Sequence, residues 1–135
     1  MTNGTSPPEL KFYTVGKVGD FKADKMRSVK VGIVDVVVLL QDDGWHAFSN
    51  YCTHVGALLT AGWINNGQVV CPFHYACFDI KTGDLVSGPG YSTLPIFKIR
   101  LEGDDVQVEV PVPADGREPQ VRLAPIADGT WSSRT

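Results

Sequence analysis

The chain has no long apolar run and no recognisable leader. Its longest uninterrupted apolar stretch, Val36–Leu40, is far shorter than the roughly 20 residues that a transmembrane helix needs. The segment Met1–Leu10 has neither the basic region nor the apolar region of a secretory signal. We therefore expect no membrane anchor and a cytoplasmic location.

The chain also lacks an excess of positive charge. It has 12 basic and 15 acidic residues, which give a net charge of -3 and a pI near 5.5. Surfaces that bind nucleic acid or anionic membranes are usually basic, so neither partner is expected. With 135 residues, 43% of them hydrophobic, the composition is that of one globular domain with a real core.

Cysteine is scarce, but two of the three cysteines are each followed closely by a histidine. The two pairs are Cys52-Thr53-His54 and Cys71-Pro72-Phe73-His74. Two thiolates and two imidazoles suffice to hold one two-iron, two-sulfide cluster, with the sulfurs on one iron and the nitrogens on the other. A centre of that kind carries single electrons and leaves no obvious substrate-binding site.

The same four residues are also the ligand types of a structural zinc site. Zinc binds four nitrogen and sulfur ligands in a tetrahedron, commonly from C-x-x-C and H-x-x-x-H pairs. The C-x-H spacing is unusually tight for that pattern, and a small zinc module would not need the many strands predicted below. The ligand spacing therefore favours an iron–sulfur cluster over zinc.

The residues around both pairs closely resemble the Rieske family. Cys52 begins the pattern C-x-H-x-G-x-x-L, Cys71 begins C-P-x-H, and F-D-x-x-T-G follows at 78–83. The segment Ser87–Tyr91 is similar to the proline loop that covers the cluster in this family, and the likeness extends over about residues 10–110. It implies one [2Fe-2S] cluster per chain, bound by Cys52, His54, Cys71 and His74. The complete ligand set argues against a degenerate domain that has lost its cluster.

Several positions indicate which kind of Rieske protein this is. Subunits of quinol-oxidising membrane complexes carry two additional cysteines, whose places are taken here by Ala57 and Phe73. In high-potential members a Ser and a Tyr donate hydrogen bonds to cluster sulfur, and Ala76 and Phe78 at the matching positions cannot. The resemblance is therefore to the soluble, low-potential ferredoxins of ring-hydroxylating dioxygenase systems. Cys77 is left over and is expected to be a small buried hydrophobe under the cluster.

Three aromatic residues near these loops carry further expectations. Tyr75 stands where the family usually has Gly, and its hydroxyl is a candidate to shield the cluster or to supply a missing donor. Trp63 is expected to pack under the cluster-binding subdomain. His46, in a strand pattern beside a Trp, is expected to be an ordinary surface or packing residue.

The rest of the sequence predicts an all-β domain. Short β-branched segments alternate with turn signals such as Asp42-Asp43-Gly44 and Asn65-Asn66-Gly67. Such a series predicts a Rieske-like antiparallel β-sandwich or barrel, with a small inserted cluster-binding subdomain at about residues 47–92. The expected strands are 11–18, 26–31, 32–41, 45–49, 62–64, 68–70, 77–80, 84–86, 94–101 and 106–110.

The chain divides into three segments on composition. Residues 1–9 are polar and expected to be flexible, and residues 10–110 form the Rieske domain. Residues 111–135 contain several prolines and are expected either to extend along the body as a tail or to be disordered at the surface.

The predicted function is that of a one-electron carrier, an electron-transfer protein rather than an enzyme. The resemblance implies that it passes electrons from a flavin-dependent reductase to a terminal oxygenase, as a monomer or weak oligomer. The alternative is a Rieske small subunit bound tightly in a larger oxidoreductase, such as a nitrite reductase-like complex. We do not expect a catalytic oxygenase component, because such a component needs a second domain with a mononuclear iron site in addition to a domain of this length.

Overall fold

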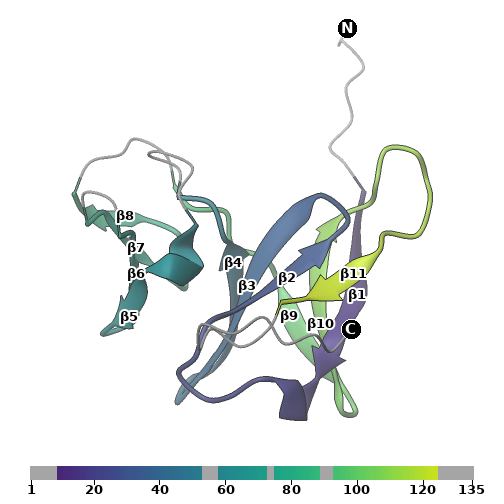
Figure 1. Cartoon of the computed structure of the whole chain (residues 1–135), viewed down its shortest axis with the longest axis horizontal. Helices are drawn as coiled ribbons and strands as arrows, with labels where there is room; N and C mark the ends of the chain where they lie inside the picture. Colours follow the sequence, from purple (N-terminus) through teal and green to yellow (C-terminus); the bar gives the residue numbers. More distant parts are fainter. Residues whose placement is uncertain (1–8, 53–57, 73–74, 89–92, 125–135) are drawn as a thin grey trace, which may run out of the picture.

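The computed structural model describes residues 9–52, 58–72, 75–88 and 93–124 and is built from antiparallel β-sheets (Figure 1). Two sheets face each other as a sandwich, and a third, smaller sheet lies to one side of them. The all-β prediction is therefore confirmed. None of the helices in the described part of the chain has the length and apolar character that crossing a bilayer requires.

The sandwich consists of a three-stranded and a four-stranded sheet. The first has the order β1 (Leu10–Lys17), β10 (Asp105–Pro111) and β9 (Ile99–Glu102). The second has the order β11 (Val121–Leu123), β2 (Arg27–Val31), β3 (Val34–Gln41) and β4 (Gly44–Ser49). Every second side chain of these strands points inward and is apolar. The space between the sheets is therefore filled largely by valines from β1, β2, β3 and β10.

The small sheet is inserted between β4 and β9. Its strands follow one another as β5 (Trp63–Asn65), β6 (Gln68–Val70), β7 (Cys77–Asp79) and β8 (Leu85–Ser87). Two single-turn 3₁₀ helices, η1 (Val18–Asp20) and η2 (Leu59–Ala61), complete the described elements. All four strands lie within residues 47–92, the range predicted for the cluster-binding subdomain.

Strand β3 joins the two parts of the molecule because both of its faces are buried. Val36 and Val38 belong to the sandwich core, whereas Val37 and Leu39 belong to a second core that the small sheet shares. Successive side chains of a strand point to opposite faces, so this division follows directly from the continuous apolar run. Phe48 of β4 joins the same second core.

Some predicted strand boundaries were wrong, for identifiable reasons. The run 32–41 begins with a turn: Gly32 has a φ of 64°, and β2 and β3 form a hairpin around it. The predicted strand 94–101 becomes regular only at Ile99, because Pro95 has no N–H to donate to a ladder. Strand β11 was not predicted at all: the three residues have weak alternation, and they form a strand by pairing with β2.

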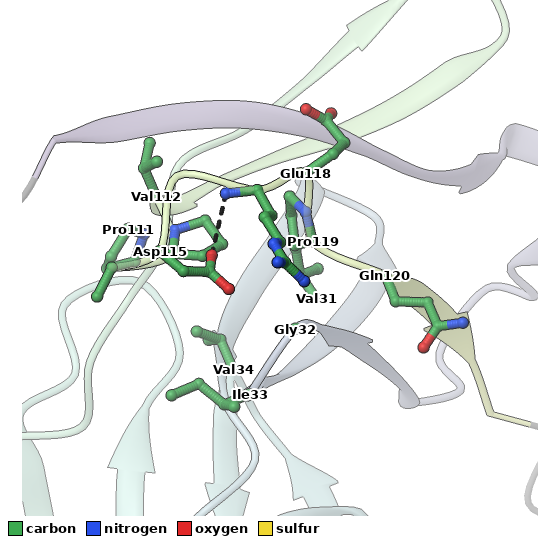
Figure 2. A pocket seen from close by; sticks show the side chains of 13 residues that line it. Val31, Gly32, Ile33, Val34, Pro111, Val112, Asp115, Glu118, Pro119 and Gln120 are labelled. Atoms are coloured by element: carbon green, nitrogen blue, oxygen red, sulfur yellow. Dashed lines mark hydrogen bonds between the residues drawn. The ribbon is translucent and has the colours of Figure 1, made fainter.

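A shallow groove of about 530 Å³ lies at the turn between β2 and β3 (Figure 2). Ile33 and Val34 lie on one side of it, and Pro111, Val112 and Asp115 lie on the other. Cys52 and Cys71, the two predicted cluster ligands among the described residues, do not line it. Its place in the fold is therefore separate from the candidate site.

The second core predicts a contrast between two aliphatic residues of the same hairpin. Leu39→Ala should lower the free energy of unfolding by about 2–5 kcal/mol, because a fully buried side chain leaves a cavity between the two parts. Ile33→Ala should change it by no more than about 0.5 kcal/mol, because Ile33 is 99% exposed. Urea denaturation curves would measure both, and equal shifts would contradict the two-sided burial of β3.

Candidate metal centre

The two cysteines of the predicted ligand set lie at the ends of strands that border the second core. Cys52 comes shortly after β4, and Cys71 comes directly after β6. The other two predicted ligands, His54 and His74, lie outside the described residues. Most of the Ser87–Tyr91 segment lies outside them as well.

Both thiols are withdrawn from solvent. Cys52 is 1% exposed and Cys71 is 0% exposed, and both belong to the second core together with Ala76 and Phe78. Thiolates are soft ligands that suit iron–sulfur clusters, and an apolar surrounding limits the access of water to them. Two buried thiols in one apolar cluster therefore fit the sulfur side of a [2Fe-2S] centre.

Asn50 closes the base of the loop that carries Cys52. Its backbone carbonyl accepts the Leu59 N–H at 2.7 Å, and its Oδ1 accepts the Thr60 N–H at 2.9 Å. Asn50, which precedes the loop, is thus hydrogen-bonded to Leu59 and Thr60, which follow the loop. A bridge between Tyr51 and Leu58 lies just above this closure.

Asn50 also fastens the loop to the sandwich. Its backbone N–H donates to the Asp35 carbonyl at 3.0 Å, and its Nδ2 donates to Asp35 Oδ1 at 3.2 Å. Ser28 Oγ donates to the same carboxylate oxygen at 2.7 Å. Asn50 and Asp35 are the two buried polar residues of the described chain, and their burial is offset by these hydrogen bonds.

The loop that carries Cys71 is closed by a backbone hydrogen bond. The Cys71 N–H donates to the Ala76 carbonyl at 2.8 Å, one step beyond the paired residues Val70 and Cys77. Tyr75 has a φ of 57°, which bends the chain back before Ala76. Gly88 approaches so closely that a Cβ there would lie 2.7 Å from the Ala76 Cα, so this contact requires glycine.

The charged groups near the small sheet lie at the end of the sheet that is opposite to Cys71. Asp43 binds His46 Nε2 at 2.7 Å and Lys81 Nζ at 3.1 Å, and so links the β3–β4 turn to the β7–β8 turn. The hydrogen bond from His46, followed by that from Lys81, lowers the pKa of Asp43 to about 2. His46 is thus a packing residue with a carboxylate partner, as predicted. Among the described residues, no three His, Cys, Asp or Glu side chains come together as a metal site.

Two expectations about individual side chains were wrong. Cys77 is only partly buried, because Phe78 occupies the inward position of β7 and its neighbour therefore faces the other side. Trp63 lies on the edge strand β5, is 46% exposed, and contacts the Tyr75 ring of the Cys71 loop instead of packing beneath the subdomain.

The sequence reasoning did not single out Asn50 or Asp35. The available signal was an aspartate within an otherwise apolar strand pattern, since such a charge needs a buried partner. Its partner, 15 residues further along the chain, becomes evident only from the fold.

Comparison with known proteins agrees with this geometry. A family model described as the Rieske [2Fe-2S] domain matches residues 11–98. The ferredoxin subunit of anthranilate 1,2-dioxygenase from Burkholderia cepacia is 27% identical over 100 residues, covering 74% of this chain and 93% of that protein. Apoptosis-inducing factor 3 from Mus musculus is 37% identical over 103 residues, which cover 76% of this chain and 17% of that protein. The chain thus spans only about a sixth of the length of that relative.

A solved structure has a fold similar to that of this chain. A chain in the complex of reduced oxygenase and oxidized ferredoxin of carbazole 1,9a-dioxygenase superposes with a TM-score of 0.66 and 29% identity. The match covers 71% of the present chain and 99% of that chain. The family, the fold and the kind of cofactor predicted from the sequence are therefore confirmed: this chain belongs to the Rieske [2Fe-2S] domain family.

Proposed function

We propose that this chain is a one-electron carrier that takes electrons from a flavin-dependent reductase and delivers them to a terminal oxygenase. The observation that carries the proposal is the burial of Cys52 and Cys71 in one apolar core of a Rieske domain. Relatives that this chain covers over most of their length, such as the anthranilate dioxygenase subunit, are ferredoxin components. When bound, a [2Fe-2S] cluster held by two thiolates and two imidazoles accepts and releases single electrons.

Four residues are proposed to hold the cofactor: Cys52, His54, Cys71 and His74. The chain contributes two buried thiols on loops whose bases are closed by hydrogen bonds. Asn50 keeps the first loop in register with β3, and the Cys71–Ala76 hydrogen bond does the same for the second loop. The apolar side chains of the second core keep water from the sulfur side.

The proposal includes the cellular location of the chain, its oligomeric state and its division into segments. A carrier that relies on thiolate ligands suits the reducing cytoplasm, and a monomer or weak oligomer suits a protein that must meet two partners. The proposed Rieske domain is 10–110, with its cluster-binding subdomain at about 47–92. Residues 111–135 follow it, and within this segment Val121–Leu123 add β11 to the sandwich. Residues 1–8 and 125–135 lie outside the described residues.

An assay of electron delivery tests the proposal. The purified chain is added to a flavin-dependent reductase, reduced pyridine nucleotide and the oxygenase component of a ring-hydroxylating system, and substrate hydroxylation is measured. Hydroxylation that requires this chain is the expected result. A chain that elutes only within a large complex during size-exclusion chromatography, and supports no such transfer when isolated, would point to a bound subunit instead.

The proposed ligands predict which cysteines the cofactor needs. The wild-type protein should contain about two irons and two labile sulfides per chain, with a red-brown visible spectrum. Cys71→Ala should lose most of the iron and the colour, whereas Cys77→Ala should keep both, because Cys77 is outside the proposed ligand set and faces away from the second core. Iron and sulfide analysis with visible absorption measures this, and a colourless protein with stoichiometric zinc would refute the ligand assignment.

The residues next to the thiols predict the reduction potential. Ala76 and Phe78 are buried beside Cys52 and Cys71 and offer no hydroxyl donor, so the potential should lie near the low end of the Rieske range, roughly -150 mV. Ala76→Ser and Phe78→Tyr should each raise the potential by tens of millivolts or more, since roughly 59 mV corresponds to a tenfold change in a one-electron equilibrium. The physical reason is that a donor aimed at sulfur favours the more negative, reduced state.

Ala47→Ser is the matched control for this series. Ala47 is as buried as Ala76 but belongs to the sandwich core, so its hydroxyl should leave the potential unchanged. Redox titration followed by visible absorption measures all four proteins. A wild-type potential well above zero would mean that other donors determine it.

The hydrogen bond between Asn50 and Asp35 predicts that a second substitution at Asp35 compensates for a first at Asn50. Asn50→Asp should destabilise the fold by about 2 kcal/mol or more and reduce the iron content, because it places two carboxylates together in a buried site. The double variant Asp35→Asn with Asn50→Asp restores one donor and one acceptor to the pair. It should therefore recover much of the lost stability and of the lost iron content. Urea denaturation and iron analysis measure the cycle, and strictly additive losses would contradict a direct Asn50–Asp35 interaction.

A further inference from the structure

The small sheet exposes an aromatic pair beside the loop of Cys71. Trp63 is 46% exposed and Tyr75 is 64% exposed, and their ring centroids lie 6.0 Å apart with the planes tilted by 55°. Of the large exposed apolar side chains in the described residues, three more come from the same subdomain: Tyr51, Leu58 and Val86. Exposed apolar groups gathered in one region of a small protein mark an interaction surface.

The register of the small sheet places this pair at the end where the cysteine loop begins. Trp63 pairs with Val70, and Val70 pairs with Cys77, so these residues form one row across the sheet. Cys71 follows Val70 directly. The opposite row contains Asn65, Gln68 and Asp79.

Charge is absent from the same end. The sequence contains no Asp, Glu, Lys or Arg between Gly44 and Phe78, and none between Leu85 and Phe97. The charged residues of the subdomain are Asp79, Lys81 and Asp84, which lie in or beside the β7–β8 turn. Lys81 is directed to Asp43 of the sandwich, and Asp79 Oδ1 accepts the Lys81 and Thr82 backbone N–H groups. Among the described residues, the charged side chains therefore lie on the sandwich and at the far end of the small sheet.

The backbone at Tyr75 gives a second, independent observation. Its φ of 57° is a left-handed conformation that glycine adopts without steric cost and that a bulky residue adopts at a cost. A large exposed ring is kept in this strained position, against Trp63 and next to the cysteine loop. Strain of this kind at a surface is a reason to look for a role of the side chain in contact with another molecule.

We propose that Trp63 and Tyr75 form the docking contact for a redox protein whose own contact face is apolar and uncharged. The inference rests on the proposed carrier function and names the chemistry of its partner. An uncharged face gains its affinity from burying aromatic area and gains nothing from steering by opposite charges. Recognition at this end should therefore depend little on salt, although the whole chain carries a net charge of -3.

The first experiment probes the charge of the face beside the Cys71 loop with two small oxidants, ferricyanide and hexaammineruthenium(III). In a stopped-flow instrument the reduced protein gives up one electron, which reduces Fe(III) to Fe(II) in the anion or Ru(III) to Ru(II) in the cation. For the wild type, each rate should change by less than about threefold between about 20 and 200 mM salt. Strong and opposite salt dependences for the two ions would overturn the neutral face.

A pair of lysine variants makes the first experiment specific. Trp63→Lys should speed the reaction with ferricyanide and slow that with the ruthenium ion by about threefold or more at low salt. Leu101→Lys should do neither, because Leu101 is 45% exposed on β9, an edge strand of the sandwich. Figure 1 shows β9 among the sandwich strands and apart from the small sheet. Visible spectra and potentials matching the wild type show that both variants are folded and loaded. Equal effects of the two lysines would overturn the assignment.

The second experiment measures docking with the flavin-dependent reductase that reduces the wild type in the assay of the proposed function. Trp63→Lys and Tyr75→Gly should raise the KM of the reductase for this chain about fivefold or more, with kcat and the reduction potential almost unchanged. Leu101→Lys should leave KM unchanged. An unchanged KM for Trp63→Lys, or a wild-type KM that rises more than about tenfold with salt, would overturn the proposal.

The two experiments separate failure of this inference from failure of the proposed function. If no reductase or oxygenase exchanges electrons with the loaded chain, the carrier function fails, whereas the small-ion rates still report the charge of the face. If sedimentation instead shows a wild-type dimer that Trp63→Lys dissociates, the occupant is a second copy of this chain and the redox-partner proposal fails.

Discussion

The burial of both faces of β3 is the constraint on which the rest of the structure depends. A three-residue strand gains little from its own ladder, and a sheet of four such strands has too small a face to be stable alone in water. The small sheet is stable because Val37, Leu39 and Phe48 of the large sheet complete its core. The thiols of Cys52 and Cys71 lie in that shared core, so the candidate metal centre inherits its rigidity from the sandwich.

The second requirement is that the loops bearing the thiols keep a fixed geometry although they leave the regular sheets. Buried polar groups serve this purpose, because each must meet its hydrogen-bonding partner in one arrangement or lose several kcal/mol of solvation. Asn50 meets Asp35 on one side and Leu59 and Thr60 on the other, and so couples the start and end of the loop to β3. A purely apolar closure would stabilise the loop without specifying its register.

Much of this was predictable from the sequence, because the informative features are local. The C-x-H and C-P-x-H spacings indicated the family, and the Asp-Gly and Asn-Gly turns located the hairpins that carry both loops. The ligand roles of His54 and His74 remain predictions. What could not be predicted depends on contacts between distant segments: β11 is a strand through its pairing with β2, and Trp63 is exposed because β5 is an edge. The Asn50–Asp35 pair likewise joins residues that no local pattern connects.

The distribution of charge along the chain has a physical rationale in this architecture. A carrier must stay soluble, which favours many charges, yet it must also bring its centre close to a partner, which favours a face that loses water cheaply. The fold satisfies both demands by separating them in space: the hairpins of the sandwich carry the charged residues, and the end of the small sheet beside Cys71 carries aromatic and small side chains. Because desolvating a charge costs far more than desolvating an aromatic ring, a contact made at this end retains more of its binding energy.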